Sequence, residues 1–230
     1  MTAGSRLPEP APRDVARGPR ADEVEIGRLV VAGYTGRDPD RVQAHIEELA
    51  ALGISPPPRV PMFYEVDSRL FQVTDRLETD HEETSGEVEP VLVVLGSGMF
   101  LGVGSDHTDR RLERDDIDAS KKACPKVVAP SLVPFEEVAD SWDSLRIRSW
   151  SGLDRRPYQD GVLGTFREPR EIVDMIDPQV EAGTAVFLGT VPTLDGHLAM
   201  DDHFEFELSM GGITLASWGY AIERGRSAIG

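Results

Sequence analysis

The sequence predicts an α+β fold that is mostly β, with few helices. Most apolar residues occur in short alternating or continuous runs bounded by Gly and Pro, a pattern typical of strands. Only a few segments show helical spacing, and neither an internal repeat nor a Gly-rich phosphate loop is present. A length of 230 residues fits one domain over 23–230, preceded by a Pro-, Ala- and Arg-rich segment, 1–22, that we expect to be a flexible tail and not a signal peptide.

The first predicted elements are a strand and a helix. Apolar residues between 24 and 31 predict a strand that delivers Gly33 and Tyr34 to a loop. Asp38 is a suitable N-cap and Pro39 a suitable first residue for the helix that follows, which we expect to end at Gly53.

After a proline-rich loop the chain is predicted to form successive strands. Gly-Ser-Gly at 96–98 predicts a hairpin turn, so the strand with Glu87 and Glu89 should pair with the one that leads to Asp106. The remaining strands and one short helix are expected in the segments MFYEV, RLFQVT, LRIRSW, REIVDMI (the helix), TAVFLGTV, HFEFELSM and ITLASWGYAIE.

Charge and composition exclude some classes of partner. The formal net charge of -17 disfavours nucleic acid and anionic membranes, and it requires that any anionic substrate be met by local cations. The lone Cys124 cannot form an intrachain disulfide, and no stretch is apolar enough to cross a bilayer. We therefore expect a cytoplasmic protein.

Three carboxylates form the most informative pattern. Glu87 and Glu89 alternate along one strand and so share a face, and Asp106 on the paired strand could complete a cluster. Oxygen-only ligands suit Mg²⁺ or Mn²⁺, or Ca²⁺, and three of them leave positions open for substrate. The alternative is an exposed acidic strand in an acidic protein.

His45 and Glu48 form a second candidate pair. Their spacing of three places both on one face of the predicted helix. A carboxylate beside an imidazole raises its basicity, as a general base that activates water requires. The alternative is a solvated helix flank.

The order of these motifs resembles the fumarylacetoacetate hydrolase superfamily from about Val24 to Glu223. The segments that carry the resemblance are AHIEE, SPPPRVPMFYEV, EVEPVLV, DHTDR, SKKACPKVVAP, YQDGVLGTF and LGTVP. The resemblance implies a mixed β-sandwich or β-roll with few helices, and a homodimer. A short interval between Glu89 and Asp106, Pro90, and the inserted Val191 indicate a divergent branch, similar to a DUF2848-like family of unknown function.

By this resemblance each motif receives a role. Glu87, Glu89 and Asp106 would bind the metal, and His45 with Glu48 would activate water. The other implied site residues are Lys122, or its neighbour Lys121, as a positive group at the reacting centre, and Arg110, Thr190 and Gln159 as substrate-binding residues.

The resemblance implies a small 2-oxo or 1,3-dicarbonyl acid as substrate. The leading hypothesis is metal-dependent hydrolysis of a C–C bond in an acylpyruvate-like acid through a metal-held enolate. The alternatives are a lyase on the same scaffold, acting as a decarboxylase or a hydratase or tautomerase, and a non-catalytic protein that binds metal and a small acid. A water-activating pair favours hydrolysis, because decarboxylation needs no nucleophilic water.

Overall fold

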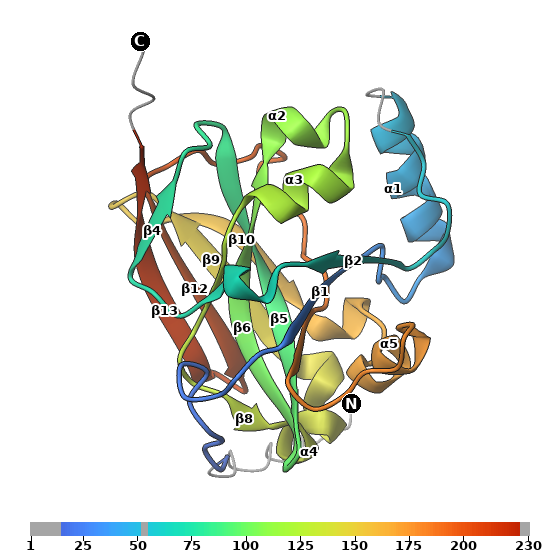
Figure 1. Ribbon diagram of the computed structural model, residues 1–230, viewed down its shortest axis with the longest axis vertical. Helices are drawn as coiled ribbons and strands as arrows, with labels where there is room; N and C mark the ends of the chain where they lie inside the picture. The colour runs from blue at the N-terminus through green and yellow to red at the C-terminus, as the bar shows by residue number, and fades with distance from the viewer. Residues whose placement is uncertain (1–14, 52–54, 226–230) are drawn as a thin grey trace, which may run out of the picture.

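Two β-sheets form the body of the protein in the computed structural model, which describes residues 15–51 and 55–225 (Figure 1). The larger sheet has the strand order β2-β1-β11-β5-β6-β7-β3, with β8 paired to β6, and the smaller has the order β10-β9-β12-β13-β4. The strands are β1 (Arg28–Gly33), β2 (Met62–Val66), β3 (Phe71–Gln72), β4 (Arg76–Thr79), β5 (Thr84–Leu95), β6 (Gly98–Asp109), β7 (Lys126–Val128), β8 (Val133–Pro134), β9 (Arg146–Ser151), β10 (Arg156–Val162), β11 (Thr184–Phe187), β12 (His203–Met210) and β13 (Ile213–Arg224). The predicted mostly β fold is confirmed.

The helices are short apart from the first. They are α1 (Pro39–Ala51), α2 (Arg110–Glu113), α3 (Ile117–Ala123), α4 (Phe135–Val138) and α5 (Pro169–Met175), with 3-10 turns η1 (Ser68–Leu70), η2 (Ala139–Ser144) and η3 (Leu163–Thr165). Figure 1 shows α2 and α3 above one end of the β5–β6 hairpin, and α1 to one side of them. No described helix meets the length and hydropathy that a membrane crossing requires.

The β5–β6 hairpin is the longest pairing in the larger sheet. Its register is unbroken from Thr84 opposite Asp109 to Leu95 opposite Gly98, as the predicted turn requires. Nearly every residue of both strands is buried, because the hairpin lies inside the larger sheet, with β11 on one side and β7 on the other. A glutamate or aspartate on these strands therefore lies in the interior of the sheet and not at an exposed edge.

Hydrophobic cores cover both faces of the larger sheet. One core lies between the two sheets and joins side chains such as Leu92 and Leu101 to Phe204 and Leu208 of β12. The second core lies on the opposite face, where Val91 and Val93 are fully buried. Burial of such side chains contributes roughly 1.5–3 kcal/mol each relative to exposure, so the hairpin is held rigidly from both sides.

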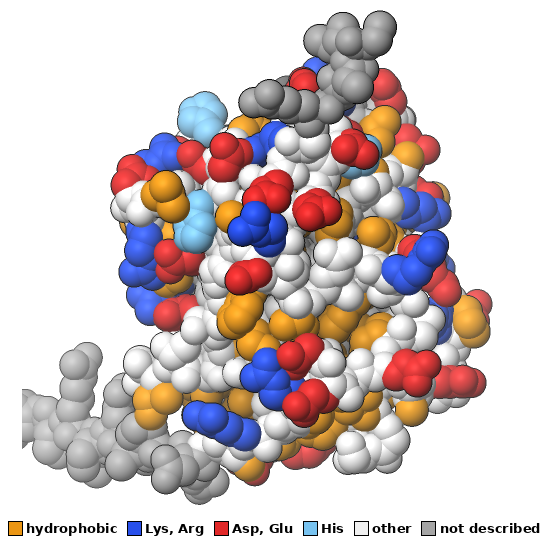
Figure 2. All heavy atoms as spheres, turned by 60° about the vertical axis from the view of Figure 1, so that its left-hand side comes forward, with side chains coloured by type: hydrophobic (Ala, Val, Ile, Leu, Met, Phe, Trp, Pro, Cys, Tyr) orange, Lys and Arg blue, Asp and Glu red, His pale blue; other side chains and the backbone are white. Residues whose placement is uncertain are grey.

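The smaller sheet has one wet face. Along β12 the apolar residues are buried while Glu205 and Glu207 alternate with them on the outside, where Arg155 and Arg148 form ion pairs with them. Figure 2 shows acidic and basic side chains interspersed on one face of the molecule, with hydrophobic side chains gathered in its lower centre.

The N-terminal segment corrects one expectation. Residues 15–22 were predicted to belong to a flexible tail, but Gly18 and Ala21 donate backbone hydrogen bonds to Leu132 and Pro130, and Ala21 is buried. Docking of small residues against the second core explains the difference, since Ala21 belongs to that core. Residues 1–14 lie outside the described part of the chain.

A buried polar chain crosses between the sheets next to the hairpin. Tyr220 donates to Ser105 Oγ (2.9 Å) and lies 2.6 Å from His107 Nε2, while Thr84 Oγ1 lies 3.1 Å from His107 Nδ1. Burial lowers the pKa of His107 to about 3, so the ring is neutral at pH 7. Because the Tyr220 hydroxyl donates its proton to Ser105, His107 donates from Nε2 to the Tyr220 oxygen and accepts from Thr84 at Nδ1.

We predict that Tyr220→Phe lowers the free energy of unfolding by about 1–3 kcal/mol, because the buried His107 donor and Ser105 hydroxyl lose their shared partner. Thr108→Val is the matched control, because Thr108 Oγ1 is buried with no hydrogen-bond partner among the described residues. Urea denaturation of both variants measures the difference. An equal loss in the two would contradict the assignment of the Tyr220 hydroxyl as the link.

Candidate functional site

The carboxylates of the hairpin lie where the sequence predicts. Glu87 on β5 is directly opposite Asp106 on β6, and Glu89 is two residues further along the same face. Glu89 and Asp106 are 2% and 0% exposed, and the Glu87 side chain is 19% exposed. Three acidic side chains in such a buried position require positive charge close by.

Two lysines supply that charge at Asp106. Lys121 Nζ on α3 lies 2.5 Å from Asp106 Oδ2, and Lys126 Nζ on β7 lies 2.6 Å from Asp106 Oδ1. Lys126 also donates to the carbonyl oxygens of His107 (2.6 Å) and Lys121 (2.7 Å), and it is wholly buried. Burial alone would raise the pKa of Asp106, but the two ammonium groups outweigh it and hold that pKa below its usual range.

The two lysines differ in their surroundings. Burial would lower the pKa of Lys121, but Asp106, Glu89 and Glu87 together raise it above its ordinary value, so the ammonium is permanently charged. Burial lowers the pKa of Lys126 despite Asp106, in part because Lys121 repels it. Lys126 is thus the inner counterion with three oxygen partners, and Lys121 is the outer one.

Glu89 is the least neutralised member of the cluster. Burial and the neighbouring Asp106 raise the pKa of Glu89 well above its ordinary value, although Lys121 opposes the rise. Among the described residues, its carboxylate accepts a hydrogen bond from the backbone N–H of Gly189, at 2.8 Å. Gly189 has φ +97°, and a Cβ there would lie 2.4 Å from Thr35 Oγ1, so a side chain at this position would push the N–H off the carboxylate.

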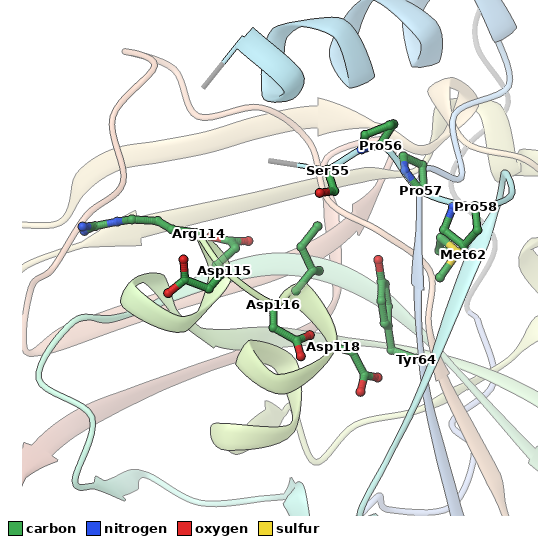
Figure 3. Close-up of a pocket in the computed structure, with 12 residues that line it drawn as sticks. Ser55, Pro56, Pro57, Pro58, Met62, Tyr64, Arg114, Asp115, Asp116 and Asp118 are labelled. Carbon is green, nitrogen blue, oxygen red and sulfur yellow. The ribbon is translucent and has the colours of Figure 1, made fainter. Parts of the chain in front are cut away.

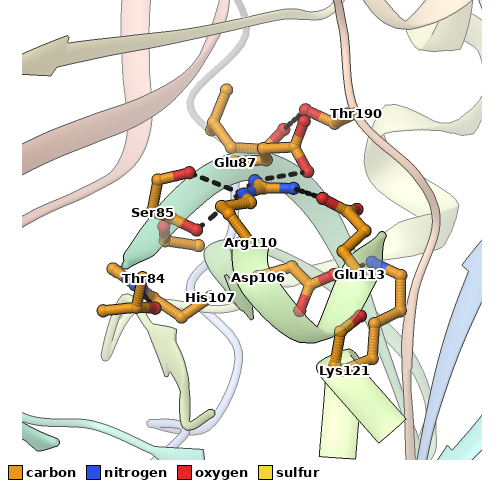
Figure 4. A network of polar contacts seen from close by, with 12 residues as sticks. Thr84, Ser85, Glu87, Asp106, His107, Arg110, Glu113, Lys121 and Thr190 are labelled. Carbon is orange, nitrogen blue, oxygen red and sulfur yellow. Dashed lines mark hydrogen bonds and ion pairs between the residues drawn. The ribbon is translucent and has the colours of Figure 1, made fainter. Parts of the chain in front are cut away.

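Arg110 anchors Glu87 from the other side (Figure 4). Its guanidinium lies 3.1 Å from Glu87 and 2.8 Å from Glu113, and its Nε donates to Ser85 Oγ at 2.8 Å. Arg110 begins α2 directly after β6, capped by the Asp109 side chain. The predicted substrate-binding arginine therefore lies in the cluster, with its guanidinium held by partners within the protein.

Gln159 and Thr190 brace the strand between the two glutamates. Gln159 Oε1 accepts from the Val88 N–H (2.8 Å) and Ser149 (3.1 Å), and its Nε2 donates to Thr190 Oγ1 (2.8 Å) and the Val191 carbonyl (2.7 Å). Thr190 in turn donates to the Val88 carbonyl at 2.9 Å. Both were predicted to bind substrate, and that role stays a prediction. In the structure the Gln159 amide is fully engaged within the protein and supports the strand.

The predicted lysine is also corrected in position. Lys122 points outward, where it forms an ion pair with Asp118 and its side chain is 49% exposed. On a short helix consecutive residues face different directions, so Lys121, the stated alternative, takes the inward position. The dyad residues His45 and Glu48 lie on α1, but their side chains are outside the described part of the structure.

Sequence reasoning missed Lys126, which lies directly opposite Asp106 in the β6–β7 register. The signal was available: the segment KVV is a short apolar strand that begins with the lysine, and its pairing to the Asp106 strand would have predicted the contact. Glu113 was missed as well, because the charged connector after Asp109 was not predicted to form helices.

The side chains of Glu87, Glu89 and Asp106 are the metal ligands that the resemblance implies. Among the side chains that the structure describes, which exclude those of His45 and Glu48, no three or more His, Cys, Asp or Glu gather closely enough to hold a metal ion. Asp106 Oδ1 is buried and accepts no hydrogen bond of good geometry, and all three predicted ligands are carboxylates. The ligands therefore fit a hard divalent cation in kind, and Lys121 would have to release Asp106 for them to converge.

A comparison with protein families identifies the family to which the chain belongs. A family described as a protein of unknown function, DUF2848, matches residues 32–213. The chain belongs to this family. A search of curated proteins gave no match.

Solved structures place this DUF2848 member in a wider fold group. A fumarylacetoacetate hydrolase family protein from yeast has a TM-score of 0.61 at 13% identity, over 86% of this chain and 94% of that one. A 2-keto-3-deoxy-D-arabinonate dehydratase has a TM-score of 0.62 at 18% identity, over 89% and 75%. A 5-carboxymethyl-2-hydroxymuconate delta-isomerase from Mycobacterium smegmatis has a TM-score of 0.62 at 14% identity, over 89% and 81%. The predicted superfamily fold is confirmed.

We predict that Lys126→Met lowers the free energy of unfolding by about 3–5 kcal/mol, because it removes a buried ammonium that contacts the Asp106 carboxylate and the carbonyl oxygens of His107 and Lys121. Lys121→Met should cost less, since the structure gives its ammonium one hydrogen-bond partner. Lys122→Met is the control and should change stability by no more than about 0.5 kcal/mol. Guanidinium denaturation of the three variants gives the ranking, and a Lys121 effect as large as that of Lys126 would contradict the division into outer and inner counterions.

Proposed function

We propose that this DUF2848 protein is a divalent-metal-dependent enzyme that hydrolyses a C–C bond in an acylpyruvate-like 2-oxo acid. The observation that carries the proposal is the buried cluster of Glu87, Glu89 and Asp106 with Lys121 beside it. A cluster of so many ionised groups is unusual in a core that serves stability alone, because burying each charge costs several kcal/mol unless it is paired. The fold group supports an enzyme, since its named members include a dehydratase and an isomerase.

Glu87, Glu89 and Asp106 would hold the metal, which we propose to be Mg²⁺ or Mn²⁺. When bound, a divalent cation would hold the substrate carboxylate and adjacent oxo group and stabilise the negative charge that develops on the oxo oxygen.

The remaining roles belong to the chain itself. Lys121 provides a permanent positive charge at the edge of the cluster, where it would offset the repulsion between an anionic 2-oxo acid and the carboxylates. Gln159 and Gly189 fix the strand and the carboxylate of Glu89, so that the cluster keeps its geometry. His45 assisted by Glu48 is proposed to take the proton from the attacking water.

The proposed reaction consumes one water. Its hydroxyl adds to the distal acyl carbon, the bond between that carbon and C3 of the pyruvate unit breaks, and the electron pair passes to C3. C3 then takes a proton, which yields pyruvate and the carboxylic acid of the acyl group. Lys121 would stabilise the anionic pyruvate unit while the bond breaks, by charge and without transferring a proton.

We predict that the protein, loaded with Mn²⁺, cleaves an acylpyruvate to pyruvate, and that His45→Gln lowers kcat by about 10²-fold or more because water activation is lost. A lactate dehydrogenase assay of released pyruvate measures the rate, and Gln43→Ala on the same helix is the control. Oxaloacetate is tested in parallel. Decarboxylation of oxaloacetate with no acylpyruvate cleavage, unaffected by His45→Gln, would replace the hydrolase with a lyase.

We predict that chelator-treated protein binds one Mg²⁺ or Mn²⁺ per chain and that Glu89→Gln weakens binding by about 100-fold, since a carboxylate ligand becomes a neutral amide. Isothermal titration measures this directly. Glu223→Gln on β13 is the control, because Glu223 forms a surface ion pair with Arg76. Wild-type protein that binds neither ion would overturn metal dependence.

We also propose that the protein is a homodimer, as the resemblance implies. Sedimentation of the full chain tests it.

A further inference from the structure

A cavity of about 450 Å³ lies between the segment before and within β2 and the α2–α3 segment (Figure 3). One wall is the loop 55–58 with Met62 and Tyr64 of β2, and the other is the segment 113–118, which includes the turn between α2 and α3. The first wall is mostly apolar, with three consecutive prolines. The second is formed almost entirely by charged side chains.

The cavity adjoins the proposed site through shared residues. Glu113 lines the cavity and also accepts from the Arg110 guanidinium that holds Glu87. Asp118 lines it three residues before Lys121 on α3, so both lie on one side of that helix. Burial raises the pKa of Tyr64, on the opposite wall, to about 12 while the Lys121 ammonium opposes the rise, so Lys121 is also an electrostatic neighbour of that wall.

The cavity wall is mainly acidic, although two of its carboxylates, those of Glu113 and Asp118, form ion pairs with Arg110 and Lys122. Four acidic side chains line it, and the basic side chain among its lining residues is Arg114, which is engaged in an ion pair with Glu83 at 3.0 Å. The acidic residues are Glu113, Asp115, Asp116 and Asp118. In the carboxylate cluster, Lys121 could pair with one carboxylate of a substrate. A second substrate carboxylate inside the cavity would find no free cation among these lining residues.

We propose that this cavity receives the distal arm of the substrate and selects against a second carboxylate there. The inference rests on the proposed function and narrows its substrate class to monocarboxylate 2-oxo acids. The distal arm carries an amino group or no charge, and an anionic arm is rejected by repulsion from the acidic wall. The overall charge of -17 acts in the same direction, because it repels a dianion more than a monoanion.

The test compares oxamates that share one binding end. Unsubstituted oxamate mimics the 2-oxo acid, and three N-substituted derivatives add an arm of similar length that ends in an ammonium, a methyl or a carboxylate group. Isothermal titration in the presence of Mg²⁺ gives the dissociation constants. We expect the order ammonium, then methyl, then carboxylate from tightest to weakest, with about tenfold or more between the first and the last at low salt.

The second part of the experiment reverses one charge of the cavity wall. Asp115 is exposed on the turn between α2 and α3, outside the ion pairs of the cluster, so Asp115→Lys should fold normally. It is expected to shrink the preference for the ammonium arm at least threefold while leaving the affinity for plain oxamate unchanged. Asp174→Lys on α5, which Figure 1 places away from α2 and α3, changes the net charge equally and should leave the preference unaltered.

The outcomes separate this inference from the function on which it rests. If plain oxamate does not bind with or without metal, the proposed function fails and the cavity assignment fails with it. If oxamate binds but the carboxylate arm binds as well as the ammonium arm, or Asp115→Lys and Asp174→Lys act alike, the proposed function stands and the charge selection is overturned.

Discussion

The antiparallel register of β5 and β6 is the constraint on which the site depends. It sets Glu87 opposite Asp106, and the alternation of side chains then places Glu89 on the same face. A slip of one residue would turn Glu87 and Glu89 to the opposite face, away from the lysines. The two-residue turn at 96–97 and the apolar side chains packed on both faces of the hairpin hold that register.

The site is rigid because the second sheet braces the first. Gln159 belongs to β10 of the smaller sheet, yet its side chain bonds to the backbone of β5 between the two glutamates. The same side chain holds Thr190, which follows Gly189, the donor to Glu89. One buried amide therefore ties together a ligand strand, the loop that supports Glu89, and the opposing sheet, and geometry of this kind is what a preorganised site requires.

The sequence predicted the hairpin and its carboxylates because these depend on local signals. A turn at 96–98 and alternation along the strands suffice to bring Glu87, Glu89 and Asp106 together. The sequence left the choice between Lys121 and Lys122 open because the charged connector gave no helical period, and without the helix the inward residue of a Lys-Lys pair cannot be assigned. The bracing contacts of Gln159 and the order of residues 15–22 were not predicted because their partners lie far away in the sequence, at Val88 and at Leu132, and no local pattern encodes such contacts.

The charge balance of the cluster explains why its members behave differently. Four carboxylates, of Glu87, Glu89, Asp106 and Glu113, share three cations, of Arg110, Lys121 and Lys126. In a buried site a surplus negative charge is costly, and it falls on the group with the weakest support. Asp106 has two ammonium partners and Glu87 has Arg110, whereas Glu89 has a single backbone N–H. The pKa of Glu89 is therefore raised, whereas the two ammonium groups lower that of Asp106. Glu89 is the position where added positive charge would be accommodated most readily.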